Sequence, residues 1–203
     1  MQNSRPGLSR TVVALEHRDF RLFYTALLVA GLGAQIQSTA ILIQVYEITG
    51  SPVHLGLTGL ARALPTIIFS LMGGIIADRV DRRRFILVTQ LLPAVFAGIL
   101  AWLTAAGEIA VWHMYVLIFL NGCVTSLGAP ARSAILPNLV PRHHLINAIA
   151  LHSTVWQASN IIGPSIAGVS IAVVGLTATY VVNGLLHVGS LGEIGRASCR
   201  ERV

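Results

Sequence analysis

Few side chains in this sequence can carry ionic or acid–base chemistry, so their positions are informative. The acidic residues are Glu16, Asp19, Glu47, Asp78, Asp81, Glu108, Glu193 and Glu201, and none lies deep inside a long apolar run. Glu47 comes closest, near the end of one run, and Arg62 lies about two helical turns inside the next. An ionisable group within a membrane is costly and is a functional candidate by default. Glu47 and Arg62 are therefore candidates for a substrate or proton path.

Three interpretations of Arg62 follow from its position. It binds an anionic group of a substrate, it pairs with Glu47 on the neighbouring run, or it is a structural arginine that snorkels to a polar surface. The sequence alone leaves these three open.

Amide side chains form a second set of candidates inside the apolar runs. They are Gln35, Gln37, Asn121, Gln157, Asn160 and Asn183. Such amides either line a polar cavity or, more often, form hydrogen bonds between helices worth about 0.6 kcal/mol each. We single out Gln35 and Asn121 as the candidates for a cavity-lining position.

No group of residues has the spacing of an enzyme or metal centre. His113, His152 and His187 are far apart, and His143 and His144 are adjacent, so their side chains would diverge on a helix. There is no nucleophile elbow, phosphate loop or metalloprotease helix. We expect no catalytic residue, no bound metal and no cofactor.

The composition is that of a membrane protein. Of the 203 residues 54% are hydrophobic and only 11% are charged, against about 25% charged in soluble domains. The mean hydropathy is +0.73. The formal charge of +6 comes from short arginine clusters between apolar runs, without the aromatic and basic interleaving of RNA-binding surfaces. We therefore expect a lipid bilayer, and no nucleic acid, as partner.

Six apolar runs follow a polar segment, residues 1–19, that we expect to be cytoplasmic. The predicted transmembrane helices span residues 20–45, 55–77, 85–106, 111–131, 145–174 and 177–192. All but the last are long enough to cross a hydrocarbon core of about 30 Å. The last is truncated.

The arginines indicate the orientation. They cluster in the N-terminal segment and in the second-to-third and fourth-to-fifth connections, and the other three connections contain no lysine or arginine. This alternation is the positive-inside pattern for a cytoplasmic N-terminus. We expect a multi-pass protein of a bacterial inner (plasma) membrane.

The C-terminal residues do not fit this pattern. From Ile194 the sequence changes from apolar to charged and reads IGRASCRERV, which resembles the translated read-through of a sequencing adapter. A helix that ended this way in lipid would leave polar groups unpaired. We interpret residues 193–203 as a non-native tail and expect the natural protein to continue well past Gly192.

The connection between the second and third runs resembles the signature loop of the major facilitator superfamily. The matching positions are Gly74, Asp78, Arg79, Arg82 and Arg83. Glycine allows the two helices to approach closely, and the arginines hold the loop in the cytoplasm. Asp81 stands where the family usually has glycine, so the turn is built differently there. The resemblance implies that this loop takes part in gating.

A second element, in the fifth run, resembles the Gly-Pro-x-x-Gly-Gly motif of antiporters in this superfamily. The matching positions are Gly163, Pro164, Ala167 and Gly168, with alanine in place of one glycine. Proline removes a backbone donor and favours a kink, and small residues allow a neighbouring helix to pack tightly. A kinked structural helix is the alternative interpretation.

A third resemblance concerns residues 130–142 and 144–148, with residues 46–51 in support. They are similar to the drug and siderophore efflux branch, which includes the enterobactin exporter and macrolide efflux proteins. The resemblance covers residues 15–192 and implies an all-α membrane protein, the N-terminal six-helix half of a twelve-helix major facilitator fold.

The implied function is secondary active efflux of a small organic molecule, such as a drug or siderophore, by alternating access. The implied partners are this small-molecule substrate, the proton as coupling ion, and the C-terminal half of the same chain. The titrating group would be Glu47, a histidine or a residue of the missing half. The alternatives are a membrane-embedded enzyme, for which no catalytic dyad is visible, and a non-transporting membrane scaffold.

Overall fold

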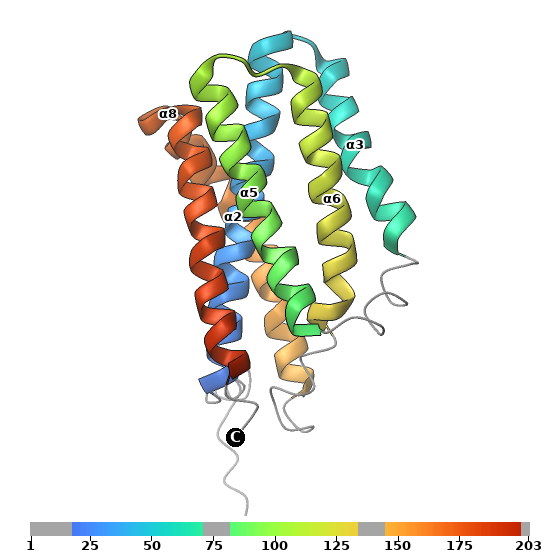
Figure 1. The fold of residues 1–203 in the computed structure, drawn as a ribbon, viewed down its shortest axis with the longest axis vertical. Coiled ribbons are helices and arrows are strands. Elements are labelled where there is room, and N and C mark those ends of the chain that lie inside the picture. Colours follow the sequence, from blue (N-terminus) through green and yellow to red (C-terminus); the bar gives the residue numbers. More distant parts are fainter. Residues whose placement is uncertain (1–17, 71–81, 134–144, 200–203) are drawn as a thin grey trace, which may run out of the picture.

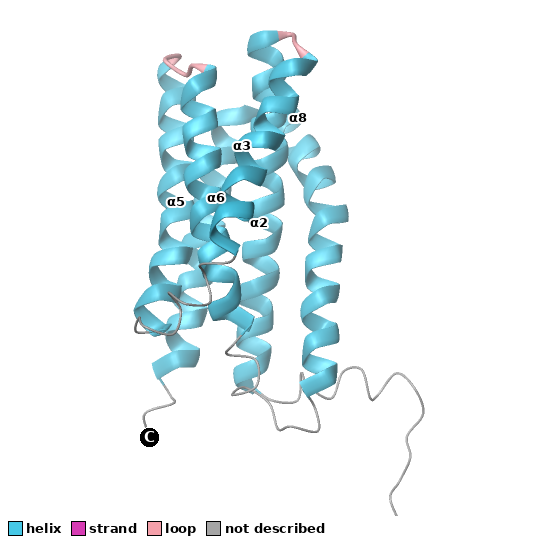
Figure 2. Cartoon of the chain, turned by 90° about the vertical axis from the view of Figure 1, so that its right-hand side faces the viewer, coloured by secondary structure: helices cyan, strands magenta, loops and turns pink. Residues whose placement is uncertain are grey.

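The described part of the chain is a bundle of long helices. The computed structural model describes residues 18–70, 82–133 and 145–199. The helices are α2 (Arg18–Thr49), α3 (Pro52–Ser70), α5 (Arg82–Ala106), α6 (Val111–Ser133) and α8 (Leu145–Cys199). They lie side by side along the long axis of the molecule, and the described residues include no strand (Figure 1, Figure 2).

Five helices in the described residues are long and apolar enough to cross a membrane. Their apolar stretches are Tyr24–Thr49, Pro52–Phe69, Val88–Ala106, Val111–Ala129 and Leu145–Ser190. A helix satisfies its backbone hydrogen bonds internally, as a spanning segment in lipid must. The prediction of an all-α membrane protein is confirmed.

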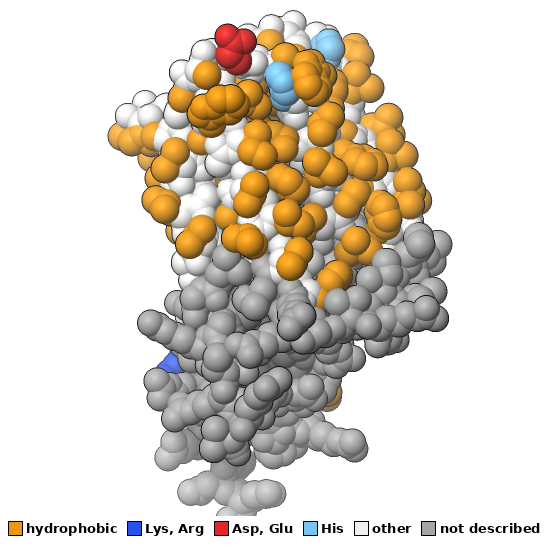
Figure 3. Space-filling model, viewed as in Figure 1, with side chains coloured by type: hydrophobic (Ala, Val, Ile, Leu, Met, Phe, Trp, Pro, Cys, Tyr) orange, Lys and Arg blue, Asp and Glu red, His pale blue; other side chains and the backbone are white. Residues whose placement is uncertain are grey.

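The outer surface of the bundle is apolar along most of its described length. Large hydrophobic side chains such as Val53, Trp102 and Ile146 are 71%, 68% and 81% exposed. Figure 3 shows apolar side chains spread over the described part of one face, with acidic and histidine side chains at one end. A soluble protein rarely exposes apolar area on this scale, so a bilayer is its natural surrounding.

A glycine follows the last residue of both α2 and α5, and both turns lie at the same end of the bundle (Figure 1). At the end of α5, Gly107 N–H donates to Thr104 O at 3.3 Å and Glu108 N–H donates to Leu103 O at 3.1 Å. These two bonds are those of a Schellman motif. Gly107 has φ +71°, which a residue without Cβ adopts at little cost. Helix α6 then begins four residues later at Val111.

Helix α8 is interrupted at Gly175, whose φ of 80° and ψ of 172° are not helical. The two arms on either side of it, residues 145–174 and 176–199, run in opposite directions (Figure 1). The Ser170 and Thr179 hydroxyls form a hydrogen bond of 2.9 Å between the arms, close to the reversal. The reversal lies at the same end of the bundle as the turns at Gly50 and Gly107.

The core lies where α2, α5, α6 and the second arm of α8 meet. Its buried residues are Ala40, Ile41, Val45, Phe96, Leu100, Ala101, Met114, Leu117 and Tyr180. Helix α2 packs mainly on α8, α5 packs on α8 and α6, and α3 packs mainly on α6. Helix α8 is therefore the element against which both α2 and α5 pack.

Two predicted segments are described only in part. The run expected at 55–77 is described as α3 only to Ser70, and residues 71–81 lie outside the described part. Helix α8 continues to Cys199, into the segment 193–203. The origin of that segment stays a prediction.

Candidate functional site

The first arm of α8 packs against α2 at small residues. A Cβ on Gly31 would lie 2.8 Å from Ser159 Oγ, and a Cβ on Gly163 would overlap the Gln35 side chain. Each contact advances four residues along both helices, so the two helices run parallel here. Gln35 Nε2 also donates a hydrogen bond to Asn160 Oδ1 across this interface.

The antiporter-like element of the sequence lies in this contact. Gly163 and Ala167 are buried, and Ala167 is 0% exposed. Pro164 is half-buried, and Gly168 is exposed with open space where a Cβ would be. Two of the four residues therefore face the bundle, and they are the two that a larger side chain would disturb. Their role in transport stays a prediction.

The second arm of α8 meets α2 through buried polar pairs. Asn183 Nδ2 donates to Gln37 Oε1 at 2.7 Å, and the Tyr180 hydroxyl donates to Gln44 Oε1 at 2.9 Å. Gln44 Nε2 donates in turn to Thr104 Oγ1 of α5 at 3.0 Å. These amides join helices, which is the commoner role that the sequence analysis left open for Gln37 and Asn183.

The sequence analysis missed the pair formed by Gln44 and Tyr180. Its signal was the seven-residue spacing between Gln37 and Gln44, which places both on one face of a helix. Their partners Asn183 and Tyr180 are three residues apart and also share a face.

A second buried polar position lies close to Gly33 of α2. A Cβ on Gly33 would lie 2.7 Å from Asn183 Oδ1 and 3.3 Å from His187 Nε2. Among the described residues, Asn183 Oδ1 and both ring nitrogens of His187 have no hydrogen-bond partner. His187 is 3% exposed, so an imidazole that can hold a proton is enclosed at this junction.

Helices α3 and α6 pack through another small residue. A Cβ on Gly122 would lie 2.5 Å from Pro65 Cγ, so the helices approach closely at this point. Ser126 Oγ donates to Thr66 Oγ1 at 3.3 Å on the same side. The neighbouring Asn121 is half-buried, and within the described chain its Oδ1 has no partner.

The two ionisable candidates of the sequence do not meet. Arg62 Nη1 donates to Ser38 Oγ of α2 at 2.7 Å. Glu47 is exposed two residues before the end of α2, and these two described side chains form no ion pair. The interpretation in which Arg62 pairs with Glu47 is not seen in this geometry.

The signature-loop residues fall largely outside the described part of the chain. Gly74, Asp78 and Arg79 lie in the segment 71–81, which the structure does not describe. Arg82 and Arg83 open α5, but only their backbone is described. The role of this loop stays a prediction.

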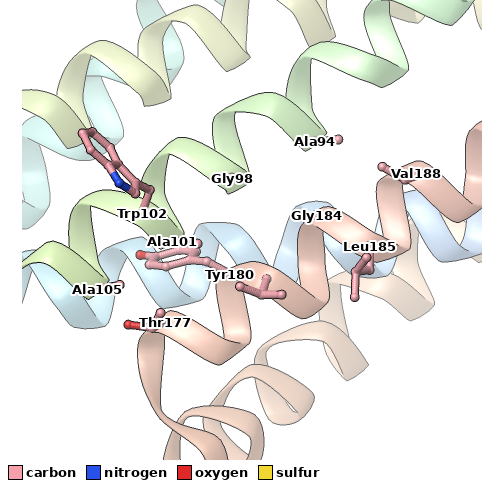
Figure 4. Close-up of a pocket in the computed structure, with 11 residues that line it drawn as sticks. Ala94, Gly98, Ala101, Trp102, Ala105, Thr177, Tyr180, Gly184, Leu185 and Val188 are labelled. Atoms are coloured by element: carbon pink, nitrogen blue, oxygen red, sulfur yellow. The ribbon is translucent and has the colours of Figure 1, made fainter.

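An apolar groove of about 450 Å³ runs between α5 and the second arm of α8 (Figure 4). Its lining residues are Ala94, Gly98, Ala101, Trp102, Ala105, Thr177, Tyr180, Val181, Gly184, Leu185 and Val188. This lining lacks the convergent polar groups that position a polar ligand. The Tyr180 hydroxyl is already bonded to Gln44. The groove therefore suits hydrocarbon and not a charged molecule.

Comparison with known families gives one match over nearly the whole chain. A family model of the major facilitator superfamily, described as transmembrane secretion effector, matches residues 9–201.

Curated relatives of the chain are bacterial transporters. It is 26% identical over 159 residues to macrolide efflux protein A of Streptococcus pyogenes, covering 78% of this chain and 38% of the relative. It is 29% identical over 136 residues to the staphyloferrin A transporter of Staphylococcus aureus, covering 66% and 34%. It is 27% identical over 189 residues to the enterobactin exporter EntS of Escherichia coli, covering 93% and 44%. The chain thus spans less than half of the length of each of these relatives.

Proposed function

Because this chain belongs to the transmembrane secretion effector family of the major facilitator superfamily, we propose that the complete protein exports a small organic molecule by alternating access, driven by a proton gradient. The family is one of transporters and not of enzymes. The observation that carries the proposal is the match over residues 9–201. Relatives named for macrolide efflux and enterobactin export support the choice of a drug-like or siderophore-like cargo.

The architecture that we propose is the N-terminal six-helix half of a twelve-helix transporter. The two arms of α8 would be the fifth and sixth crossings, which the break at Gly175 supports. The coverage of 34–44% of the relatives' length is compatible with half of a protein. The arginine-rich connections support a cytoplasmic N-terminus in a bacterial plasma membrane.

Coupling to protons is the finer part of the proposal. Within this chain the candidates for the proton-carrying group are Glu47 and the histidines, of which His187 is buried beside Asn183. The parallel packing of Gly163 on Gln35 supports an antiporter-like arrangement of α2 and the first arm of α8. The loop with Asp78 and Arg79 would gate the path.

The test uses the complete gene, recovered downstream of Gly192 and expressed in a bacterium that lacks its own efflux pumps. In everted membrane vesicles we expect uptake of a macrolide or a catecholate siderophore, and we expect a protonophore, which collapses both the pH gradient and the membrane voltage, to stop it. Asp78→Asn serves as an inactive comparison at equal protein level. Uptake that persists after the protonophore would remove proton coupling. Absence of uptake for a broad panel of compounds would favour a non-transporting scaffold.

A further inference from the structure

Arg62 lies near the middle of the described apolar stretch of α3, Pro52–Phe69. It comes ten residues after Pro52, where α3 begins, which is about 15 Å along the helix. Its partner Ser38 comes eleven residues before Thr49, where α2 ends at the same side of the bundle. Asn121 comes ten residues after Val111, the start of α6. All three residues are therefore near half of a hydrocarbon core of about 30 Å.

The charge of Arg62 is not compensated by an acidic group in the described part of the chain. Glu47 and Glu108 are the acidic residues whose side chains the structure describes, and both lie within about two residues of a helix end. Glu47 is thus about 12 Å from the level of Arg62 along the helix axes. This difference in depth explains why the two side chains do not pair.

The Arg62 guanidinium also has N–H donors without a partner among the described residues. An arginine carries five N–H groups in a planar fork. Among the described residues, Ser38 is the partner that it contacts, through one donor at 2.7 Å. The Arg62 side chain is exposed.

The face around Arg62 cannot be one that meets lipid. A charged side chain at the centre of a bilayer is highly unfavourable unless it faces protein or a water-filled cavity. Thr66, one turn along α3, is also exposed and bonds to Ser126 of α6, so hydroxyl groups continue the polar surface. This face must therefore meet water or protein, and the translocation path of the proposed transporter would supply such a surface.

We infer that Arg62 is the anion-recognising residue of the transported molecule's path, with Ser38 as its positioning residue. The group that it would bind is a carboxylate or another oxyanion, because the guanidinium fork matches two oxygens at once. The inference rests on the proposed transport function and narrows its cargo to a small organic anion, which excludes a basic macrolide.

The test compares two dyes with the same ring system and opposite charge, a fluorescein carboxylate and a rhodamine ester. Binding to the purified complete protein is measured by fluorescence anisotropy. We expect Arg62→Gln to weaken binding of the anionic dye by about tenfold or more, as loss of a charge-assisted hydrogen bond does, and to leave the cationic dye unaffected. Arg62→Lys keeps the charge without the fork, so its binding should be intermediate.

The matched control is Arg21→Gln, which removes the same charge from an exposed position in the first turn of α2. It should bind both dyes as the unaltered protein does. Equal weakening by Arg21→Gln and Arg62→Gln would overturn the inference, because general attraction between opposite charges would then explain it. Absence of any preference for the anionic dye would also overturn it, as expected if a carboxylate elsewhere in the complete protein neutralises Arg62.

The two proposals fail separately. Binding of the anionic dye through Arg62, without export of any compound from vesicles, would overturn the efflux function and leave the anion site. Export of the cationic dye alone, without binding that depends on Arg62, would overturn the anion site and leave the efflux function.

Discussion

The interface between α2 and α8 and the exposed face around Arg62 are both polar regions of a membrane-spanning bundle, but their polar groups are paired to different extents. Gln37 and Asn183 are 3% and 0% exposed and bond to each other. Arg62 is exposed and contacts Ser38 through one of its donors. The first region joins two helices through these pairs, whereas Arg62 carries a charge that no described acidic group compensates.

Polar side chains within a membrane-spanning bundle can have two different roles. A buried amide that finds a partner fixes the register of two helices, although Asn183 Oδ1 has no partner among the described residues. A charge that is held on one side and open on the other is costly in lipid unless a ligand, water or another protein segment faces it. Charge and exposure, more than polarity alone, distinguish Arg62 from the buried amide pairs of this chain.

The largest effect on stability should come from Gly163→Ala. The added methyl group would overlap the Gln35 side chain, so α2 and the first arm of α8 would have to separate. We expect a loss of about 1–3 kcal/mol in the free energy of unfolding, as for overpacked cores. Thermal unfolding of the complete protein in detergent measures it.

The matched control for this substitution is Gly168→Ala, five residues along the same arm, where a Cβ meets open space. It should be neutral or stabilise slightly, because alanine favours a helix by about 0.5–1 kcal/mol over glycine. Similar losses at both positions would show that the contact with Gln35 does not hold the arm to α2.

A smaller effect is expected from the amide pair. In a double-mutant cycle of Gln37→Leu and Asn183→Leu, we expect a coupling of about 0.6 kcal/mol and at most about 1.7 kcal/mol. Unfolding in mixed micelles gives the four free energies that the cycle needs. Gln157→Leu, at an exposed position of the first arm, is the control and should change stability little. A coupling near zero would mean that the hydrogen bond between Gln37 and Asn183 does not stabilise the contact between their helices. The contrast between this interface and the face around Arg62 would then be weaker.

The smallest effect on stability should come from Arg62→Gln. Because the side chain is exposed and makes one hydrogen bond in the described chain, its loss should change the free energy of unfolding by no more than about 0.5 kcal/mol. The same thermal assay measures it. A loss as large as that of Gly163→Ala would show that Arg62 holds helices together, and the contrast between the two regions would disappear.

The class of fold was accessible from sequence because hydropathy and length decide it: the apolar runs predict membrane helices, and the described helices have that character. The side-chain partners were not accessible. Whether Gln37 meets Asn183, or Arg62 meets Ser38, depends on how each helix is rotated about its axis, which apolar runs without a strong polar face do not specify. The lack of contact between Glu47 and Arg62 could have been predicted, since their distances from the loop at Gly50 differ by about 12 Å.

The depth of Arg62 also has an electrical consequence. A unit charge that crosses a membrane potential of 100 mV changes its energy by about 2.3 kcal/mol, so a charge that reaches half depth changes it by about 1.2 kcal/mol. In a cell with a negative interior, this field favours the outward movement of an anion. The anion that we propose for the Arg62 site would carry its negative charge out of the cell, so the membrane voltage would favour its export and the export would be electrogenic.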